Sequence, residues 1–164
     1  IPASIKLAQG MLESSYGRSS AAKELKAHFC IKGKNELSKR YYDKTEKSNA
    51  NYKGYKSVWW SFRDHSHLLT ANSEYKDFNN YDWIFTNLNH SNYSKSLEST
   101  NKWRKKKGLP QIPKMWKYSW SNLDHYEKVA YSLQACGYAT DKKYANKLIS
   151  IIEKYSLYEL DRIS

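Results

Sequence analysis

The amino-acid sequence predicts a mainly α-helical domain of the α+β class, with a helical core and a small β ribbon lobe that borders a cleft. Three observations lead to this prediction. Apolar residues recur with helical spacing near the N-terminus, this spacing returns after Ser57 and after Tyr126, and between them it gives way to short tyrosine-rich segments. A length of 164 residues with 15% aromatic residues is enough for one domain with a full core.

The first predicted helix, residues 5–17, carries the candidate catalytic group. Gln9 and Glu13 are four residues apart, at the border of an apolar stripe, so they project together from a mostly buried helix. Partial burial would raise the pKa of Glu13, which a general acid working near neutral pH requires. An exposed glutamate on a helix flank is the alternative that these residues alone leave open. The stripe consists of Ile1, Ile5, Ala8, Leu12 and Tyr16, widened by Leu7 and Met11.

The next elements are a short helix and the β ribbon. Gly17 is expected to end the first helix, and Ser19 or Ser20 to cap a second helix that runs to about Ala27. The ribbon is expected at about residues 38–56, with strands at 40–42 and 52–55 and a long, mobile connection between them.

Clear helical periodicity marks the remaining elements. Ser57 is expected to cap a third helix whose buried stripe is Val58, Phe62, His65 and Leu69. A helix at 126–135 is expected to end at Gly137, and Thr140 to cap the last helix. The predicted buried face of that last helix is Tyr144, Leu148, Ile151, Ile152 and Tyr155.

Residues 1–164 are predicted to form a single domain that includes an aromatic and basic insertion at about 72–122. The insertion contains several tryptophans and the basic run 102–107, and it has little periodicity. One interpretation is a looped arm with one or two short helices and a solvated basic face. The other is an arm whose cations and aromatic rings meet an anionic or sugar ligand.

Charge and composition restrict the partners and the compartment. The formal net charge of +12 indicates an anionic partner: nucleic acid, an anionic membrane surface or an acidic wall polymer. No stretch is apolar enough for a transmembrane segment and none has the form of a secretory signal, but a chain that opens at Ile-Pro is expected to be a mature or excised domain. Cys30 and Cys136 are too few for a metal motif, so each is a small buried residue or the two form one bridge.

Four blocks of the sequence carry specific motifs: IPASIKLAQGMLESSYGRS, HFCIK, YKSVWWSFRDHSHLL and YEKVAYSLQACGYATDKKYANKLISIIEKY. They resemble the bacterial endo-β-N-acetylglucosaminidases of glycoside hydrolase family 73, lysozyme-like enzymes that cut peptidoglycan and include flagellar and autolysin domains. They stand in the family's order, and LAQ-x-x-LES and GYATD-x-x-YA are the most specific of their motifs.

The resemblance implies roles for individual residues. Glu13 occupies the position of the family's general acid, Tyr138 faces the catalytic cleft, and Asp64 and His65 are structural. The second carboxylate is expected on the mobile ribbon, where Glu46 and Asp43 are both candidates and both could instead be solvated loop charges. The acetamido group of the substrate is a third possible nucleophile. The expected substrate-binding side chains are Gln9, Phe29, Tyr42 and Tyr126, with no metal and no cofactor.

Three positions depart from the family pattern. Ser14-Ser15 replaces Ser-Gly after the glutamate, residues 26–30 differ from the usual cleft wall, and Trp60 stands where a capping glutamate is usual. None removes the proposed acid.

The implied function is hydrolysis of the β-1,4 bond between N-acetylglucosamine and N-acetylmuramic acid in peptidoglycan. The implied partners are peptidoglycan glycan strands and anionic wall polymers, and the implied location is secreted, periplasmic or at the cell envelope. A catalytically silent glycan-binding module on the same fold is one alternative. A nucleic-acid binder that uses Lys102 to Lys107 with Trp103 is another, but no helix-turn-helix, ribonucleoprotein or zinc-finger signature accompanies that run.

Overall fold

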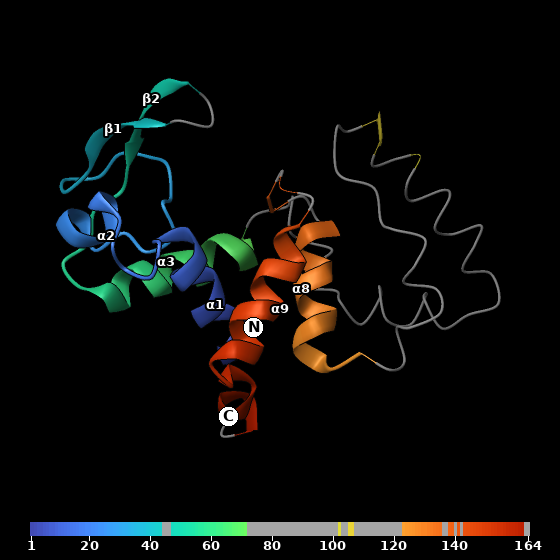
Figure 1. Ribbon diagram of the computed structural model, residues 1–164. Coiled ribbons are helices and arrows are strands. Elements are labelled where there is room, and N and C mark those ends of the chain that lie inside the picture. The colour runs from blue at the N-terminus through green and yellow to red at the C-terminus, as the bar shows by residue number, and fades with distance from the viewer. Residues whose placement is uncertain are drawn as a thin grey trace.

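The computed structural model shows a mainly helical chain with one two-stranded sheet among the residues it describes (Figure 1). These residues are 1–43, 47–71, 123–135, 138, 139, 141 and 143–162, with single positions at 102, 105 and 106. Nearly all of the predicted insertion at 72–122 therefore lies outside them. The elements are α1 (Ala3–Glu13), α2 (Ser20–Leu25), β1 (Lys39–Asp43), β2 (Ser48–Tyr52), α3 (Val58–Ala71), α8 (His125–Ala135), α9 (Tyr144–Lys154) and the 3-10 helix η3 (Leu157–Arg162). The predicted fold class is confirmed.

The hydrophobic core lies where α1, α8 and α9 pack together. Figure 1 shows α8 and α9 side by side next to α1, with α2 and the β ribbon at the other end of the molecule. The largest fully buried apolar side chains are Ile5, Leu69, Val129, Leu133, Leu148 and Ile152. The core thus unites the first and last helices of the chain, and α1 is fixed by residues more than a hundred positions away in the sequence.

A contact between the two ends of the chain caps α1. Pro2 precedes the helix and supplies no side-chain cap. Instead the Asp161 carboxylate accepts hydrogen bonds from the Ser4 N–H (2.9 Å) and from the Ser4 hydroxyl (2.5 Å), and Ser4 is fully buried. A negative charge at a helix N-terminus also interacts favourably with the helix dipole.

The C-terminal end of α1 differs from the prediction. The helix ends at Glu13, four residues before Gly17, because the Ser14 hydroxyl donates to the Gly10 carbonyl (2.5 Å) and accepts from the Gly17 N–H (2.8 Å). Ser15 and Tyr16 then adopt left-handed conformations, with φ of 51° and 60°. Tyr16 consequently leaves the helical stripe and is exposed, as Ile1 is at the other end.

The β ribbon is antiparallel and pairs Lys39 with Tyr52 and Asp43 with Ser48. The predicted second strand at 52–55 is wrong, because the strand runs from Ser48 to Tyr52. Its polar sequence SNANY gives no apolar alternation, since these side chains are exposed or only half-buried. The ladder with β1 supplies its backbone hydrogen bonds, so pairing overrides the weak strand propensity.

Side-chain and backbone hydrogen bonds attach the ribbon to α2. Glu24 of α2 binds Lys39 (3.1 Å) and accepts from the Tyr41 hydroxyl (3.0 Å) on β1. After β2, the Tyr55 N–H donates to the Leu25 carbonyl (2.8 Å). These contacts join α2 to β1 and to the segment after β2, so we include α2 in the ribbon lobe.

The other helices lie close to their predicted ranges, although α2 ends at Leu25 and Phe62 of α3 is half-buried. Ser19 caps α2 by accepting from the Ala22 N–H, as predicted. Val58 and Tyr155, both predicted to be buried, are exposed. The cap predicted at Thr140 lies outside the described residues, and Lys143, which precedes α9, supplies no side-chain cap.

No helix in the described part of the chain is both long and apolar enough to span a membrane.

The Asp161 cap yields a stability prediction. Asp161→Ala leaves the buried Ser4 N–H and hydroxyl without their acceptor, and hydrogen bonds to charged groups contribute about 1.5–3 kcal/mol, so the free energy of unfolding should fall by about that amount. Urea denaturation measures it. Glu159→Ala is the control because it removes only an exposed pair with Arg162 in the same 3-10 helix. Equal losses in both variants would contradict the role of Asp161.

Candidate active site

Glu13 is the last residue of α1 and is half-buried. Burial raises the pKa of its carboxyl group, while the hydrogen bond that Oε1 accepts from the Tyr144 hydroxyl (3.2 Å) lowers it, and the net pKa is raised. Among the described residues, Tyr144 is the hydrogen-bond partner of this carboxyl group. The structure thus places Glu13 where the charged form is disfavoured, as general acid catalysis requires.

Gln9 and Tyr144 support this carboxyl group from the core. The Gln9 side chain is fully buried, and its Nε2 donates to the Tyr144 hydroxyl (3.3 Å), which in turn donates to Glu13. The prediction that Gln9 contacts substrate is therefore corrected: α9 covers the side of α1 that was expected to border the cleft. Its Oε1 has no hydrogen-bond partner among the described residues.

A second chain of polar contacts lies beside the first. The His65 ring lies between the Lys6 ammonium, 2.9 Å from Nδ1, and the Tyr138 hydroxyl, 2.8 Å from Nε2. Because an ammonium group can only donate, Nδ1 accepts and Nε2 carries the proton that is donated to Tyr138. The rings of Tyr138 and Tyr144 are 5.4 Å apart, so the two chains meet beside Glu13.

Electrostatics agree with this tautomer. Burial, followed by the nearby Lys6 charge, lowers the pKa of His65 to about 3, so the ring is neutral at physiological pH. Burial lowers the pKa of Lys6 to about 8. At neutral pH the ammonium group is therefore still largely protonated and can donate to the ring.

Phe29 packs beneath this network. Its ring stacks on His65 with centroids 3.9 Å apart and meets Phe62 edge-on at 4.8 Å. Phe29 is only 5% exposed, so its ring belongs to the interior and the predicted contact with substrate is corrected. Gly10 allows this packing, since a Cβ there would lie 3.0 Å from the Phe62 ring.

The other two predicted substrate-binding aromatics lie far apart. Tyr126 is in the core at the start of α8, where its ring stacks on Tyr158 of η3. At the opposite end of α8, the Gln134 side chain accepts a hydrogen bond from the N–H of Ala145, the residue after Tyr144. The structure therefore does not bring Tyr126 to Glu13. Tyr42 is 60% exposed on β1 and remains accessible to a ligand.

Of the two candidates for the second carboxylate, the structure describes the backbone of Asp43 alone. Asp43 is the last residue of β1 and pairs through its backbone with Ser48, while Glu46 lies outside the described residues. Within the described chain, no group of three His, Cys, Asp or Glu side chains is close enough to hold a metal ion. Cys30 is half-buried, with its sulfur 3.7 Å from the Glu13 carbonyl oxygen, and Cys136 is not described.

Tyr144 is the site residue that sequence reasoning missed. Its spacing predicted a core position, which is correct, since it is 3% exposed. The signal that could have identified it is its place as the tyrosine of GYATD-x-x-YA, close in sequence to Tyr138.

Comparisons with known proteins identify the family of this chain. A family model named glucosaminidase and described as mannosyl-glycoprotein endo-beta-N-acetylglucosaminidase matches residues 1–157. Exo-glucosaminidase LytG of Bacillus subtilis (strain 168) is 28% identical over 168 residues, an alignment that covers 98% of this chain and 46% of LytG. The chain thus spans about half the length of this curated relative.

Solved structures show the same fold. The catalytic domain of the autolysin Auto from Listeria monocytogenes matches with a TM-score of 0.56 and 27% identity, covering 96% of this chain and 73% of that one. An N-acetylmuramoyl-L-alanine amidase from Staphylococcus aureus matches with a TM-score of 0.58 and 30% identity, covering 98% and 38%. The glycoside hydrolase domain of Salmonella typhimurium FlgJ, at 22% identity, matches in fold with a TM-score of 0.54, covering 97% and 77%.

The fold is therefore that of the lysozyme-like glycoside hydrolase domains. Within this class the chain belongs to the glucosaminidase family, whose model matches nearly its full length. The family predicted from the sequence blocks is confirmed.

The Tyr144 hydrogen bond yields a prediction for pH dependence. Tyr144→Phe removes a bond that lowers the pKa of Glu13, so this pKa should rise further, and the alkaline limb of the pH–rate profile should move to higher pH. The measurement is kcat/KM against pH on a soluble glycan fragment. Tyr131→Phe, which removes a hydroxyl bonded to Asn146 on the same pair of helices, is the control and should leave the limb in place. An alkaline limb that moves to lower pH would refute the assignment.

Proposed function

We propose that this chain is an endo-acting glucosaminidase that hydrolyses the β-1,4 bond between N-acetylglucosamine and N-acetylmuramic acid in peptidoglycan. The observation that carries the proposal is Glu13, a half-buried carboxyl group with a raised pKa at the end of a rigid buried helix. Membership of the glucosaminidase family supports it. The family description is of an endo-enzyme and LytG is named as an exo-enzyme, so the size of the released fragments tests this detail.

In the proposed reaction, Glu13 protonates the leaving glycosidic oxygen. Glycoside hydrolysis also requires a group that activates water or attacks carbon. We assign this role to Glu46 or, failing that, to Asp43, and keep the acetamido group of the substrate as the alternative nucleophile. We propose that Tyr138 and Tyr42 contact the substrate. The Tyr138 hydroxyl lies 2.8 Å from His65 Nε2, and the exposure of Tyr42 on β1 supports a contact from the ribbon.

The proposed location follows from the substrate. Peptidoglycan lies outside the cytoplasmic membrane, so the chain would act as a secreted, periplasmic or envelope protein. Its net charge of +12 favours association with anionic polymers of the wall. Nucleic acid is not a proposed partner.

The first test concerns the acid. Glu13→Gln keeps the shape of the side chain but cannot donate an acidic proton, and loss of general acid catalysis typically reduces the rate by about 10²–10⁴-fold. We expect native circular dichroism, sedimentation with purified peptidoglycan, and no clearing in a zymogram. Glu153→Gln, an exposed carboxylate on α9, is the control and should clear normally.

Two results would contradict the proposal. Clearing by Glu13→Gln at the wild-type level would exclude Glu13 as the acid. A wild-type protein that sediments with every wall preparation and clears none would instead identify a silent glycan-binding module.

The second test concerns the other carboxylate. Glu46→Gln or Asp43→Asn should reduce turnover by about 10²-fold or more if that residue activates water. NMR of the released sugar adds an independent criterion, because a water-activating base gives inversion at the anomeric carbon, whereas participation of the acetamido group gives retention. Near-normal turnover in both variants, together with retention, would assign the step to the substrate.

A further inference from the structure

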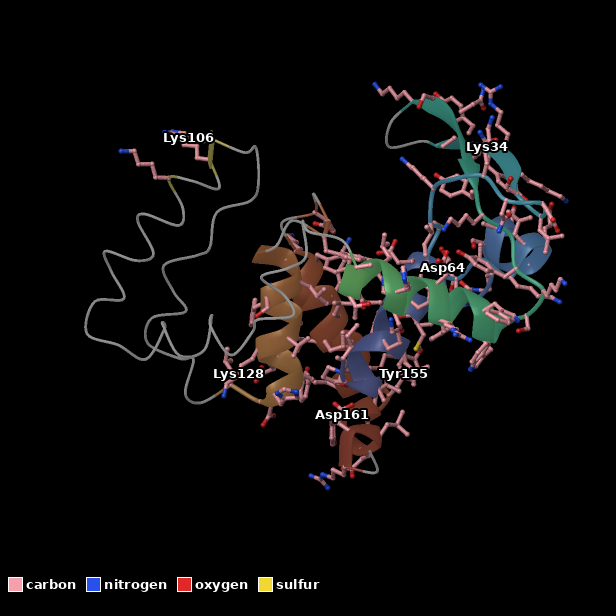
Figure 2. The ribbon with its side chains drawn as sticks, turned by 180° about the vertical axis from the view of Figure 1, so that it is seen from behind. Lys34, Asp64, Lys106, Lys128, Tyr155 and Asp161 are labelled. Carbon is pink, nitrogen blue, oxygen red and sulfur yellow. The ribbon has the colours of Figure 1, made fainter. Side chains whose placement is uncertain are left out.

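A cavity of about 840 Å³ lies between the base of the β ribbon and α3. The residues of its lining that matter here are Lys34, Leu37, Tyr55, Lys56, Trp60 and Arg63. Figure 2 shows Lys34 on the ribbon lobe and Asp64 on the edge of α3 that faces this lobe. Neither Glu13 nor Tyr144 contributes to the lining, so this cavity is distinct from the candidate active site.

The helix α3 separates the two places. At about 100° per residue, Trp60, Arg63, Asp64 and His67 form one stripe, and the buried residues Ser61, His65 and Leu69 lie on the opposite side. The buried side carries His65, which contacts Lys6 of α1 and Tyr138. A ligand in the cavity would therefore contact the face of α3 that points away from α1.

Hydrogen bonds hold the cavity walls in place. The Asp64 carboxylate binds the Lys53 ammonium (3.0 Å) and the Tyr55 hydroxyl (2.7 Å), which ties α3 to the chain that follows β2. The Asn35 side chain donates to the Gly54 carbonyl (2.8 Å) and accepts from the Gly54 N–H. A Cβ at Gly54 would lie 2.2 Å from the Leu37 carbonyl oxygen, so the two segments approach as closely as glycine allows. A preformed wall reduces the entropy lost on binding.

The lining has an excess of positive charge. It contains four cationic side chains, Lys34, Lys53, Lys56 and Arg63, and two carboxylates, Glu36 and Asp64. Lys53 is paired with Asp64, whereas no ion pair between described residues involves the other three cations. The cavity can therefore accept an anion without first breaking an ion pair.

Trp60 lines the cavity, and Trp59 beside it extends the exposed aromatic surface. Trp59 is 58% and Trp60 46% exposed, and their rings meet edge-on at 4.8 Å. The Arg63 guanidinium lies 5.2 Å from each ring centroid. Large apolar side chains exposed together mark a contact surface, and a guanidinium beside them combines stacking with phosphate binding.

We propose that this cavity is a second, non-catalytic site that binds a phosphodiester-linked, sugar-substituted polyol polymer of the cell wall. Sugar rings pack on Trp59 and Trp60, while Lys34, Lys56 and Arg63 contact the phosphates. A phosphodiester suits the site because it keeps its full charge at physiological pH and offers several oxygens to a guanidinium and two ammonium groups. The choice of a wall polymer rests on the proposed function, which brings the chain to the wall.

The test compares two variants of equal charge. Lys34, Lys56 and Arg63 are replaced together by Ala in one, and in the control Lys23, Lys154 and Arg162, which are exposed elsewhere, are replaced by Ala. Binding to soluble poly(glycerol phosphate) is measured by calorimetry at low salt. Replacement of the cavity cations should weaken binding about tenfold or more, whereas the control should change it by less than about threefold.

Trp60→Ala separates stacking from charge. It should weaken binding of glucosylated poly(glycerol phosphate) more than binding of the unsubstituted polymer. Equal losses with both polymers would contradict the stacking role, and equal losses in the two charge variants would show that net charge alone drives binding.

Two further outcomes would overturn the proposal. One is that the wild type does not bind either polymer. The other is that single-stranded DNA of equal charge binds as tightly, with the same dependence on Lys34, Lys56 and Arg63, which would indicate a nucleic-acid site. Turnover of a phosphate-free glycan by the wild type is measured separately, so its absence would contradict the proposed hydrolysis without affecting the binding comparison.

Discussion

The burial of α1 fixes the position of Glu13, and the candidate active site depends on this constraint. Asp161 holds the helix at its start, and the core residues of α8 and α9 hold it along its length. Gly10 lets Phe29 and Phe62 approach its other side. The packing that positions the carboxyl group also removes water from it, so geometry and raised pKa have one cause.

His65 and Glu13, which belong to the two neighbouring hydrogen-bond networks of the site, have pKa values shifted in opposite directions. His65 has a folded pKa of about 3 against an ordinary value of 6.5, so its neutral form stabilises the fold above pH 6.5, and this contribution is lost as the pH falls toward 3. Glu13 has a raised pKa, so it takes up its proton more readily in the folded state as the pH falls. Between these pKa values, Glu13 is protonated while His65 still donates to Tyr138. A protonated Glu13 and a neutral His65 that donates to Tyr138 can therefore exist at the same pH.

Periodicity predicted the helices, because burial imposes a regular spacing on long elements. It put Glu13 at the border of a buried stripe, whereas the role of acid came from the resemblance to the family. It did not predict the end of α1, where the Ser14 hydroxyl competes with the helix for backbone partners. Nor did periodicity distinguish an aromatic or amide side chain that binds a ligand from one that packs in the interior. Phe29 and Gln9 have the chemistry of ligand-binding residues, and only the packing of α3 and α9 against them shows that both belong to the interior. Tyr144 was missed because its spacing predicted a core position, and a core residue was not expected to bond the catalytic carboxyl group as well.

The placement of the basic cavity across α3 follows from what a general acid requires. A cluster of cations close to Glu13 would favour its charged form and lower its pKa, which would remove the proton that catalysis needs. Lys34, Lys56 and Arg63 instead lie on the far side of a helix whose diameter with side chains is about 10–12 Å. The helix and its side chains keep these cations out of direct contact with Glu13, and a charge–charge interaction weakens with distance. The fold can therefore carry a cationic cavity without placing its cations against the acid.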